Sequence, residues 1–397
     1  MTPLRSLFPT ELRERLLALR HDLHRHPELS FQEKRSAARL HDELAALGPA
    51  ELRRVAGTGV IARIKGTDPG APVVALRGDI DALPIQEDTG LPFSSASPGV
   101  MHACGHDVHA AWTVGAAHLL SARPARGDVI ILLQPAEETG RGAPAVLESG
   151  ALDGVAAIFG AHVDRRFPVG QVVAQAGSLA AAADEFAIEL VGSGAHGARP
   201  HEGSDPIVGA GVLILALQTI VARRLSPGTP AVVSIGTLKA GTAPNVTPDT
   251  ASLTGTLRSL DPETRRLLHA ELQRIAESTA RAHGLEARVS LELGPPPVVN
   301  PAGPVEWARQ AVRSLLGKQA LVPLGYQNMG GEDFAYYLEK LSGCFLRVGA
   351  REEGGAFIPA HTPRFYAADE SIFVGAAVLA ETARVAAARL QKQSSTV

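Results

Sequence analysis

The chain has 397 residues, of which 45% are hydrophobic and 20% are charged; this globular composition excludes disorder, collagen and coiled coil and allows two or three cores of about 150 residues each. Its 38 Lys and Arg residues nearly balance 41 Asp and Glu residues, for a formal charge of -3, so no cationic field exists to hold nucleic acid or an anionic membrane, and a small neutral or mildly charged substrate fits better. With only two cysteines in the chain, a disulfide-stapled scaffold is not expected and a reducing compartment is the default.

Charged residues interrupt the first twenty positions, among them Glu11, Arg13 and Glu14. We therefore expect no apolar signal-peptide core, and the predicted location is the cytoplasm. The longest apolar stretch, Gly209 to Leu217, is shorter than the roughly 20 residues that span a bilayer. We expect it to form a buried helix, and we expect no membrane partner.

The first half of the chain predicts alternating helices and strands. Residues 10–47 repeat Leu and Ala at helical spacing with a break at His26-Pro27, which predicts two helices. Runs rich in Val, Ile and Leu predict strands at 59–65, 73–77, 128–134 and 155–162. Helical stretches at 108–122 and 143–148 separate the last three of these strands. This rhythm predicts an α/β fold with a mostly parallel sheet and helices on both faces.

From Asp184 the pattern changes to a β-α-β-β-α-β order. The strands are expected near 184–190, 231–239, 250–258 and 286–293, and the helices at 206–223 and 262–283. This order predicts a ferredoxin-like α+β unit, which the stiff segment Gly294-Pro-Pro-Pro297 closes. The α/β character then resumes, with helices at 304–316, 332–340 and 369–391 and a strand at 343–348. We predict one domain from 1–183 and 295–397, with 184–294 inserted into it.

The densest group of reactive side chains is Met101-His-Ala-Cys-Gly-His-Asp-Val-His109, a loop that leads into a predicted helix. A thiolate and an imidazole two residues apart, at Cys104 and His106, can turn toward one zinc or similar ion. The alternative is a helix start capped by Asp107 beside an inert cysteine.

A second group, Gln134-Pro-Ala-Glu-Glu138, ends a buried strand, where α/β sheets place their ligands. Adjacent carboxylates point in different directions, so one can bind a metal while the other acts as a base toward a water. The alternative is a pair of solvated acids before a helix.

Three further positions lie at strand ends or in loops. His162 ends a predicted strand at the same sheet edge, and His361 lies in a Pro-rich loop where a surface histidine is the alternative. Period-2 alternation places Arg77, Asp79 and Asp81 on one face. Such acids orient metal-bound histidines, or they form a structural ion pair with Arg77.

Eight motifs follow one another along the chain: His24-Arg-His-Pro-Glu-Leu-Ser30, Arg77-Gly-Asp-Ile-Asp-Ala-Leu-Pro84, Met101 to His109, Gln134 to Glu138, His196-Gly-Ala-Arg-Pro-His201, Pro244-Asn-Val246, Gly330-Gly-Glu-Asp-Phe334 and His361-Thr-Pro363. As an ordered set, they resemble the dinuclear metallo-amidohydrolases related to hippurate hydrolase, N-acyl-amino-acid amidohydrolases and plant auxin-conjugate hydrolases, over about residues 10 to 390. The resemblance implies a catalytic domain with an inserted lid and dimerisation domain.

The resemblance also implies roles for single residues. Five residues would bind two divalent ions per subunit, with Cys104 as the bridge. The ions would be zinc or manganese, with cobalt or nickel also open. Glu137 would be the base, and Asp79 would support the metal-bound histidines. The five implied ligands are Cys104, His106, Glu138, His162 and His361.

On the inserted domain, His196 and Asn245 look like partners of the substrate carbonyl and carboxylate. Arg258 and Gly331 are further candidates for holding the carboxylate, for which arginine offers a two-pronged donor. The resemblance further implies a homodimer formed through the inserted domain, in which His196 reaches the active site of the other subunit. A higher homo-oligomer is the alternative.

The implied activity is metal-dependent hydrolysis of N-acyl amino acids to a carboxylic acid and a free amino acid. A dipeptidase or carboxypeptidase and an N-acyl-diaminopimelate deacylase remain alternatives, because the chemistry is shared and only the pocket differs. Two other hypotheses are a thiol hydrolase with Cys104 as nucleophile and a two-domain binding module without catalysis.

Overall fold

The computed structural model describes residue 4 and residues 6–394, which divide into two compact units. The first comprises Met1–Gly177, Asn300–Gly325 and Asp333–Val397, and the second comprises Ser178–Val299 and Tyr326–Glu332. The second unit is thus larger than the predicted inserted segment 184–294. The catalytic role of the first unit and the lid role of the second stay predictions.

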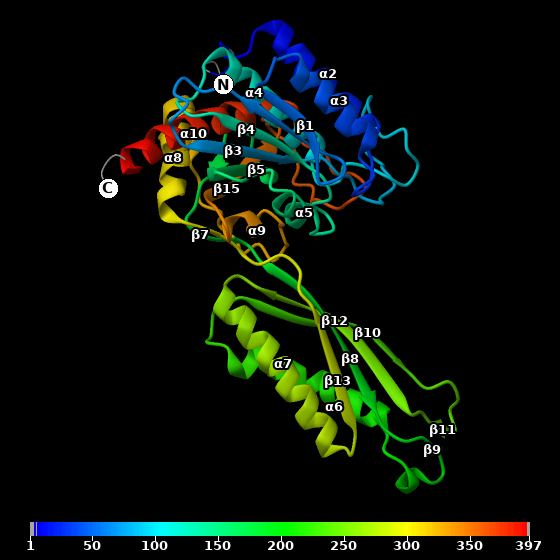
Figure 1. The fold of residues 1–397 in the computed structure, drawn as a ribbon. Helices are drawn as coiled ribbons and strands as arrows, with labels where there is room; N and C mark the ends of the chain where they lie inside the picture. The colour runs from blue at the N-terminus through cyan, green and yellow to red at the C-terminus, as the bar shows by residue number, and fades with distance from the viewer. Residues whose placement is uncertain (1–3, 5, 395–397) are drawn as a thin grey trace. The chain divides into compact units, whose positions relative to one another are not determined.

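A seven-stranded sheet forms the centre of the first unit (Figure 1). Its four middle strands are parallel and its outer pairs are antiparallel, so the predicted mostly parallel sheet is confirmed. In spatial order the strands are β1 (Glu51–Val55), β2 (Gly59–Ile64), β4 (Val129–Gln134), β3 (Val73–Asp79), β5 (Val155–Pro168), β15 (Ser342–Arg351) and β6 (Val172–Val173).

Helices cover both faces of this sheet. Figure 1 shows α4 and α10 on one side and α5 and α9 on the other, and the contacts agree, because α4 packs on β3 and β4, α10 on β3 and β5, α5 on β4, and α9 on β15. The helices of this unit are α2 (Thr10–Arg25), α3 (Lys34–Ala45), α4 (His106–Ala122), α5 (Gly142–Glu148), α8 (Ala302–Leu316), α9 (Ala335–Leu338) and α10 (Ser371–Ser394). The helix expected over 332–340 is therefore wrong in extent, since only 335–338 is helical.

The parallel strands bring their carboxyl ends to one edge of the sheet. Asp79 at the end of β3 pairs with Gln134 at the end of β4, and His162 on β5 pairs with Arg347 on β15. Side chains that follow in the connecting loops therefore collect at this edge, which is where ligands bind in sheets of this kind.

The second unit has the predicted β-α-β-β-α-β order, with an antiparallel sheet ordered β10-β12-β8-β13. Alternating residues of β8, including Phe186, Ile188 and Leu190, are buried, because successive strand residues point to opposite faces. The main elements are β8 (Ala182–Val191), α6 (Pro206–Thr219), β10 (Ala231–Ala240), β12 (Thr250–Ser259), α7 (Pro262–Ala282) and β13 (Glu286–Glu292).

The buried helix expected around Gly209 to Leu217 is only half buried. Its inner face is in the core through Leu213 and Leu217, whereas Val208 and Leu215 are 53% and 72% exposed. Apolar residues occupy all sides of this helix rather than one face, so the side turned away from the sheet is apolar and exposed.

Among the described residues, two helices are long and apolar enough to cross a membrane by length and composition alone: Pro206–Arg224, and Ser371–Lys392 within α10. The first continues α6 through a π-helical turn at Ile220–Arg224, so it is longer than the predicted apolar stretch. The second is a core helix, because 78% of its apolar window is buried.

Candidate metal centre

The loop before α4 and the first turn of the helix present Cys104 and His106 to the carboxyl edge of the sheet. Gly105 between them has a φ of 90° and forms the N-cap of α4. A Cβ at this position would lie 2.5 Å from Cγ2 of Val163, so only glycine fits both the backbone conformation and the space. The glycine lets the loop turn into the helix, with the Cys104 thiol directed toward His162 on β5 and the His106 ring beside the carboxylates of Asp81 and Glu138.

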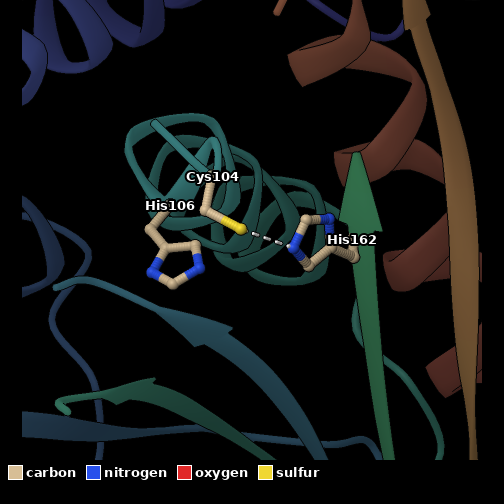
Figure 2. A group of neighbouring side chains, drawn as sticks. All are labelled: Cys104, His106 and His162. Carbon is tan, nitrogen blue, oxygen red and sulfur yellow. Dashed lines mark hydrogen bonds between the residues drawn. The ribbon is translucent and has the colours of Figure 1, made fainter. Parts of the chain in front are cut away.

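His162 on β5 faces this loop (Figure 2). Its Nε2 lies 3.2 Å from Sγ of Cys104, and its Nδ1 donates to the carbonyl of Val163 at 2.7 Å. This hydrogen bond leaves the Nε2 lone pair directed toward the thiol. Burial lowers the pKa of His162 well below its usual value, so the ring is neutral, as a metal ligand must be.

Glu138 and His361 close the other side of the cluster. Oε1 of Glu138 lies 3.7 Å from Nε2 of His106, and its Oε2 lies 3.4 Å from Nε2 of His361. The five predicted ligands thus form overlapping groups whose candidate ligand atoms lie within 4.8 Å of one another, and Cys104 belongs to two of these groups. The structure brings together the whole predicted ligand set.

The charges in this cluster fit a cation. Burial, together with Asp81 and Asp79, raises the pKa of Glu138 to about 7. Burial and the charge of Glu138 raise the pKa of the Cys104 thiol. Oε1 of Glu138 and Nε2 of His106 are buried without a hydrogen-bond partner, which is costly for two polar atoms unless an ion lies between them. A divalent cation would reverse both pKa shifts and satisfy both atoms.

Asp81 is the acid that orients His106. Its Oδ1 lies 3.2 Å from Nδ1 of His106, and its Oδ2 accepts from the amide of Glu138 at 3.0 Å and from the hydroxyl of Ser30 at 2.7 Å. One buried carboxylate therefore holds two of the candidate ligands.

Asp79 pairs instead with His109, whose Nδ1 lies 2.5 Å from Oδ1 of Asp79. Nε2 of His109 accepts from the amide of Val163 at 2.9 Å, so both ring nitrogens are used and His109 has no atom left for a metal. Asp79 also pairs with Arg77 at 2.5 Å. Through His109 it supports the segment of β5 that carries His162, which lies within the strand rather than at its predicted end because β5 continues to Pro168. Oδ2 of Asp79 also lies 3.8 Å from Nε2 of His106.

A buried network beneath Glu137 was not predicted from the sequence. Asp333 accepts from Arg77 at 2.7 Å, from Gln134 at 2.8 Å and from the amide of Ala143 at 2.8 Å, and its own amide donates to Glu137 at 3.4 Å. Asp333 and His109 both belong to motifs recognised in the sequence. Their position in those motifs was the sequence signal that could have marked them as functional. It could not identify their hydrogen-bond partners, because those partners lie far away along the chain.

The predicted residues of the second unit fall into two pairs. His196 on β9 (Ala195–His196) is exposed, and the amide of Gly197 donates to the carbonyl of Asn245 at 2.8 Å. A Cβ at Gly331 would lie 3.8 Å from Nη1 of Arg258. These pairs are at opposite ends of β12, whose stretch from Thr250 to Arg258 spans about 26 Å at ~3.3 Å per residue. The structure does not bring the four residues together within this unit.

A cluster of thiol, imidazole and carboxylate ligands with a second carboxylate beside it, at the carboxyl edge of a mostly parallel sheet, defines a metal-dependent hydrolase. The chain belongs to Peptidase family M20/M25/M40, whose model matches residues 75–385.

Similar proteins agree with this family. An N-acetylcysteine deacetylase of Bacillus subtilis (strain 168) is 42% identical over 378 residues, covering 93% of this chain and 96% of the relative. An IAA-amino acid hydrolase ILR1-like 2 of Arabidopsis thaliana is 36% identical over 374 residues, covering 93% and 84%. The crystal structure of Bacillus subtilis YXEP protein, described as a dinuclear metal binding peptidase from the M20 family, has a TM-score of 0.84 at 39% identity and covers 94% of this chain and 98% of that one. The resemblance inferred from the motifs is confirmed, and the chain is an amidohydrolase that acts on linear amides.

Proposed function

We propose that this protein hydrolyses the amide bond of N-acyl amino acids, releasing a carboxylic acid and a free amino acid. The observation that supports it most is the convergence of Cys104, His106 and Glu138, two of them with buried polar atoms that have no hydrogen-bond partner. The named substrates of the deacetylase and IAA-amino acid hydrolase relatives are acylated amino acids, which favours this substrate class.

In this proposal two divalent cations, zinc or manganese with cobalt or nickel also possible, are held by the five ligand residues named above. Bound there, the cations would polarise the scissile carbonyl and lower the pKa of a water. Glu137 takes the proton of that water and returns it to the leaving amine. The amide of Asp333 and the network beneath it hold the carboxylate of Glu137 in one orientation, so the base is positioned before the substrate arrives.

The substrate carboxylate and carbonyl would be bound by the second unit. We assign His196 to the oxyanion that develops on the substrate carbonyl and Asn245 to the substrate carboxylate. Arg258, beside Gly331, is a second candidate for binding that carboxylate. The distance of about 26 Å along β12 between the two pairs supports their use by different active sites. A two-fold homodimer meets that requirement, with His196 serving the other subunit.

The uncovered face of α6 supports pairing through this unit. Ile207, Val208 and Leu215 are exposed on α6, and Leu238 is exposed on β10, an edge strand of its sheet. An apolar helix face beside an open strand edge is suited to a second copy of the same chain. We also propose the cytoplasm as the location of the protein, on the basis of its two unpaired cysteines.

The test is a substrate screen with each metal. The purified apoprotein is supplied in turn with Zn²⁺, Mn²⁺, Co²⁺ or Ni²⁺ and offered N-acetyl, N-benzoyl and longer N-acyl amino acids alongside dipeptides and N-succinyl-diaminopimelate, and the released amine is measured. We expect turnover of N-acyl amino acids that chelator abolishes and metal restores. Preferential cleavage of dipeptides or of the diaminopimelate derivative would replace the proposed substrate class, and full activity in chelator would favour a thiol hydrolase.

A further inference from the structure

Ala136, the residue before Glu137, has a left-handed backbone. Its φ is 53°, a region that residues with a Cβ adopt at a cost and that glycine adopts freely. The residue is fully buried, and its carbonyl accepts from the amide of Gly142 at 3.0 Å. The turn that directs Glu137 is thus strained, and a strained turn persists only where its surroundings hold it.

The amide of Ala136 is held by a side chain from a distant part of the chain. It donates to Oε1 of Glu33 at 2.9 Å, and Oε2 of Glu33 accepts from the hydroxyl of Thr58 at 2.5 Å. Glu33 is fully buried and Thr58 nearly so. A buried carboxylate with one donor on each oxygen is well satisfied, and charged acceptors form the stronger hydrogen bonds to backbone amides.

Glu33 does not use this carboxylate for its own helix. It stands at the N-cap of α3, yet no side-chain hydrogen bond caps that helix. Burial raises the pKa of Glu33, so keeping a carboxylate here carries a cost that a helix cap would not require. The contact with Ala136 is therefore the feature that distinguishes this position from an ordinary helix start.

We propose that Glu33, fixed by Thr58, is a positioning residue that holds the left-handed turn at Ala136 and thereby sets where the carboxylate of Glu137 lies. The inference rests on the proposed role of Glu137 as base. Glu138 is less dependent on this contact, because Asp81 already holds its amide. Loss of the hydrogen bond between Glu33 and Ala136 should therefore affect proton transfer by Glu137 more than metal binding by Glu138.

The experiment compares four variants of the metal-loaded enzyme. Glu33→Ala removes the acceptor, Glu33→Gln keeps an oxygen that can accept from Ala136, and Thr58→Val removes only the hydroxyl. Glu43→Ala is the matched control, because Glu43 is also buried, lies on α3 and pairs with Arg15 and Arg39. For each we measure kcat, KM, bound metal and hydrogen exchange of the peptide that covers residues 130–141.

We expect Glu33→Ala to lower kcat by about 10²-fold, the scale of a misplacement near 1 Å, with KM and metal content unchanged and faster exchange at Ala136. Glu33→Gln should recover most of kcat, Thr58→Val should give a smaller loss with the same exchange change, and Glu43→Ala should match wild type. If Glu33→Ala fails to fold, the kcat and hydrogen exchange of Thr58→Val and Glu33→Gln test the proposal instead. Three results would each overturn the proposal. The first is wild-type kcat and wild-type hydrogen exchange in both Thr58→Val and Glu33→Ala. The second is a kcat loss in Glu43→Ala equal to that in Glu33→Ala, and the third is a loss of bound metal in step with activity.

Failure of the proposed function would look different. Wild type would then be inactive toward every N-acyl amino acid, whereas the exchange difference between Glu33→Ala and wild type needs no substrate and would persist. The kcat arm would be measured on whichever linear amide the enzyme cleaves.

Discussion

Glu137 and Glu138 are adjacent in the chain but have different surroundings. Glu138 faces His106 and His361, whereas Glu137 accepts from the amide of Asp333. We expect Glu137→Gln to keep both metals while kcat falls by about 10² to 10⁴-fold, as for loss of a general base. Glu138→Gln should lose metal. Elemental analysis alongside kinetics measures both, and the reverse pattern would exchange the two roles.

Cys104 belongs to one candidate ligand group with His106 and His162 and to another with Glu138 and His361, so in the proposed function its thiolate would serve both ions. A serine hydroxyl lacks the charge and softness of a thiolate. Cys104→Ser should therefore lose metal and activity together. Two ions per chain and unchanged turnover in this variant would show that Cys104 is an ordinary buried thiol.

At the residue scale, the sequence predicted which side chains gather but not which of them pair. Strand alternation places Asp79 and Asp81 on one face, but it does not distinguish the acid that orients His106 from the acid that pairs with His109. That distinction depends on the position of α4 relative to β3, which is a property of tertiary packing. The contacts of Asp333 and Glu33 were out of reach for the same reason.

At the scale of elements, α2 anchors the start of α4, where Cys104 lies just before the helix and His106 is its first residue. Nε of Arg20 donates to Asp107 at 2.8 Å, Nδ1 of His24 lies 2.9 Å from the same carboxylate, and Nε2 of His24 lies 3.2 Å from Glu87. Burial lowers the pKa of His24, but the Asp107 carboxylate outweighs it and raises the pKa to about 9. Helices α2 and α4 are therefore joined by buried charges.

This pairing makes stability depend on pH. His24 has a pKa of about 9 when folded, against 6.5 as its ordinary value, so its contribution of about 3 kcal/mol is complete below pH 6.5 and is lost as the pH rises through 9. His24→Gln should remove that dependence. Urea midpoints at pH 6, 8 and 10 test this, and an equal decline in both proteins would assign the effect to other groups.

Element types were predictable where periodicity was strong, as in the ferredoxin-like order of the second unit. Two expectations failed for physical reasons. The composition of α6 indicates a buried helix, but the sheet can cover only one face of it. The segment around Asp333 has helical composition, yet its carboxylate is bound to Arg77 and Gln134 and the helix begins only at Ala335.

For the whole molecule, the proposed two-fold dimer gives a quantitative prediction. His196→Ala and Glu137→Ala should each be nearly inactive, but a mixed dimer has one site with both residues intact. Random exchange of equal amounts makes half of the dimers mixed, so about a quarter of wild-type activity should return.

The control is a measurement of subunit exchange with differently tagged chains. Verified exchange without recovery would mean that His196 acts within its own chain or not at all. Sedimentation as a monomer at assay concentrations would remove the basis for the dimer.

The metal cluster draws one of its five candidate ligands, His361, from close to the end of the chain, while Cys104 and His106 come from the first third. Arg20 likewise pairs with Asp369, in the turn just before α10. Closing such long loops requires the whole intervening chain. In the proposed function, a nascent chain therefore lacks the complete ligand set until residue 361 has left the ribosome, and we expect no metal-dependent hydrolysis before that point.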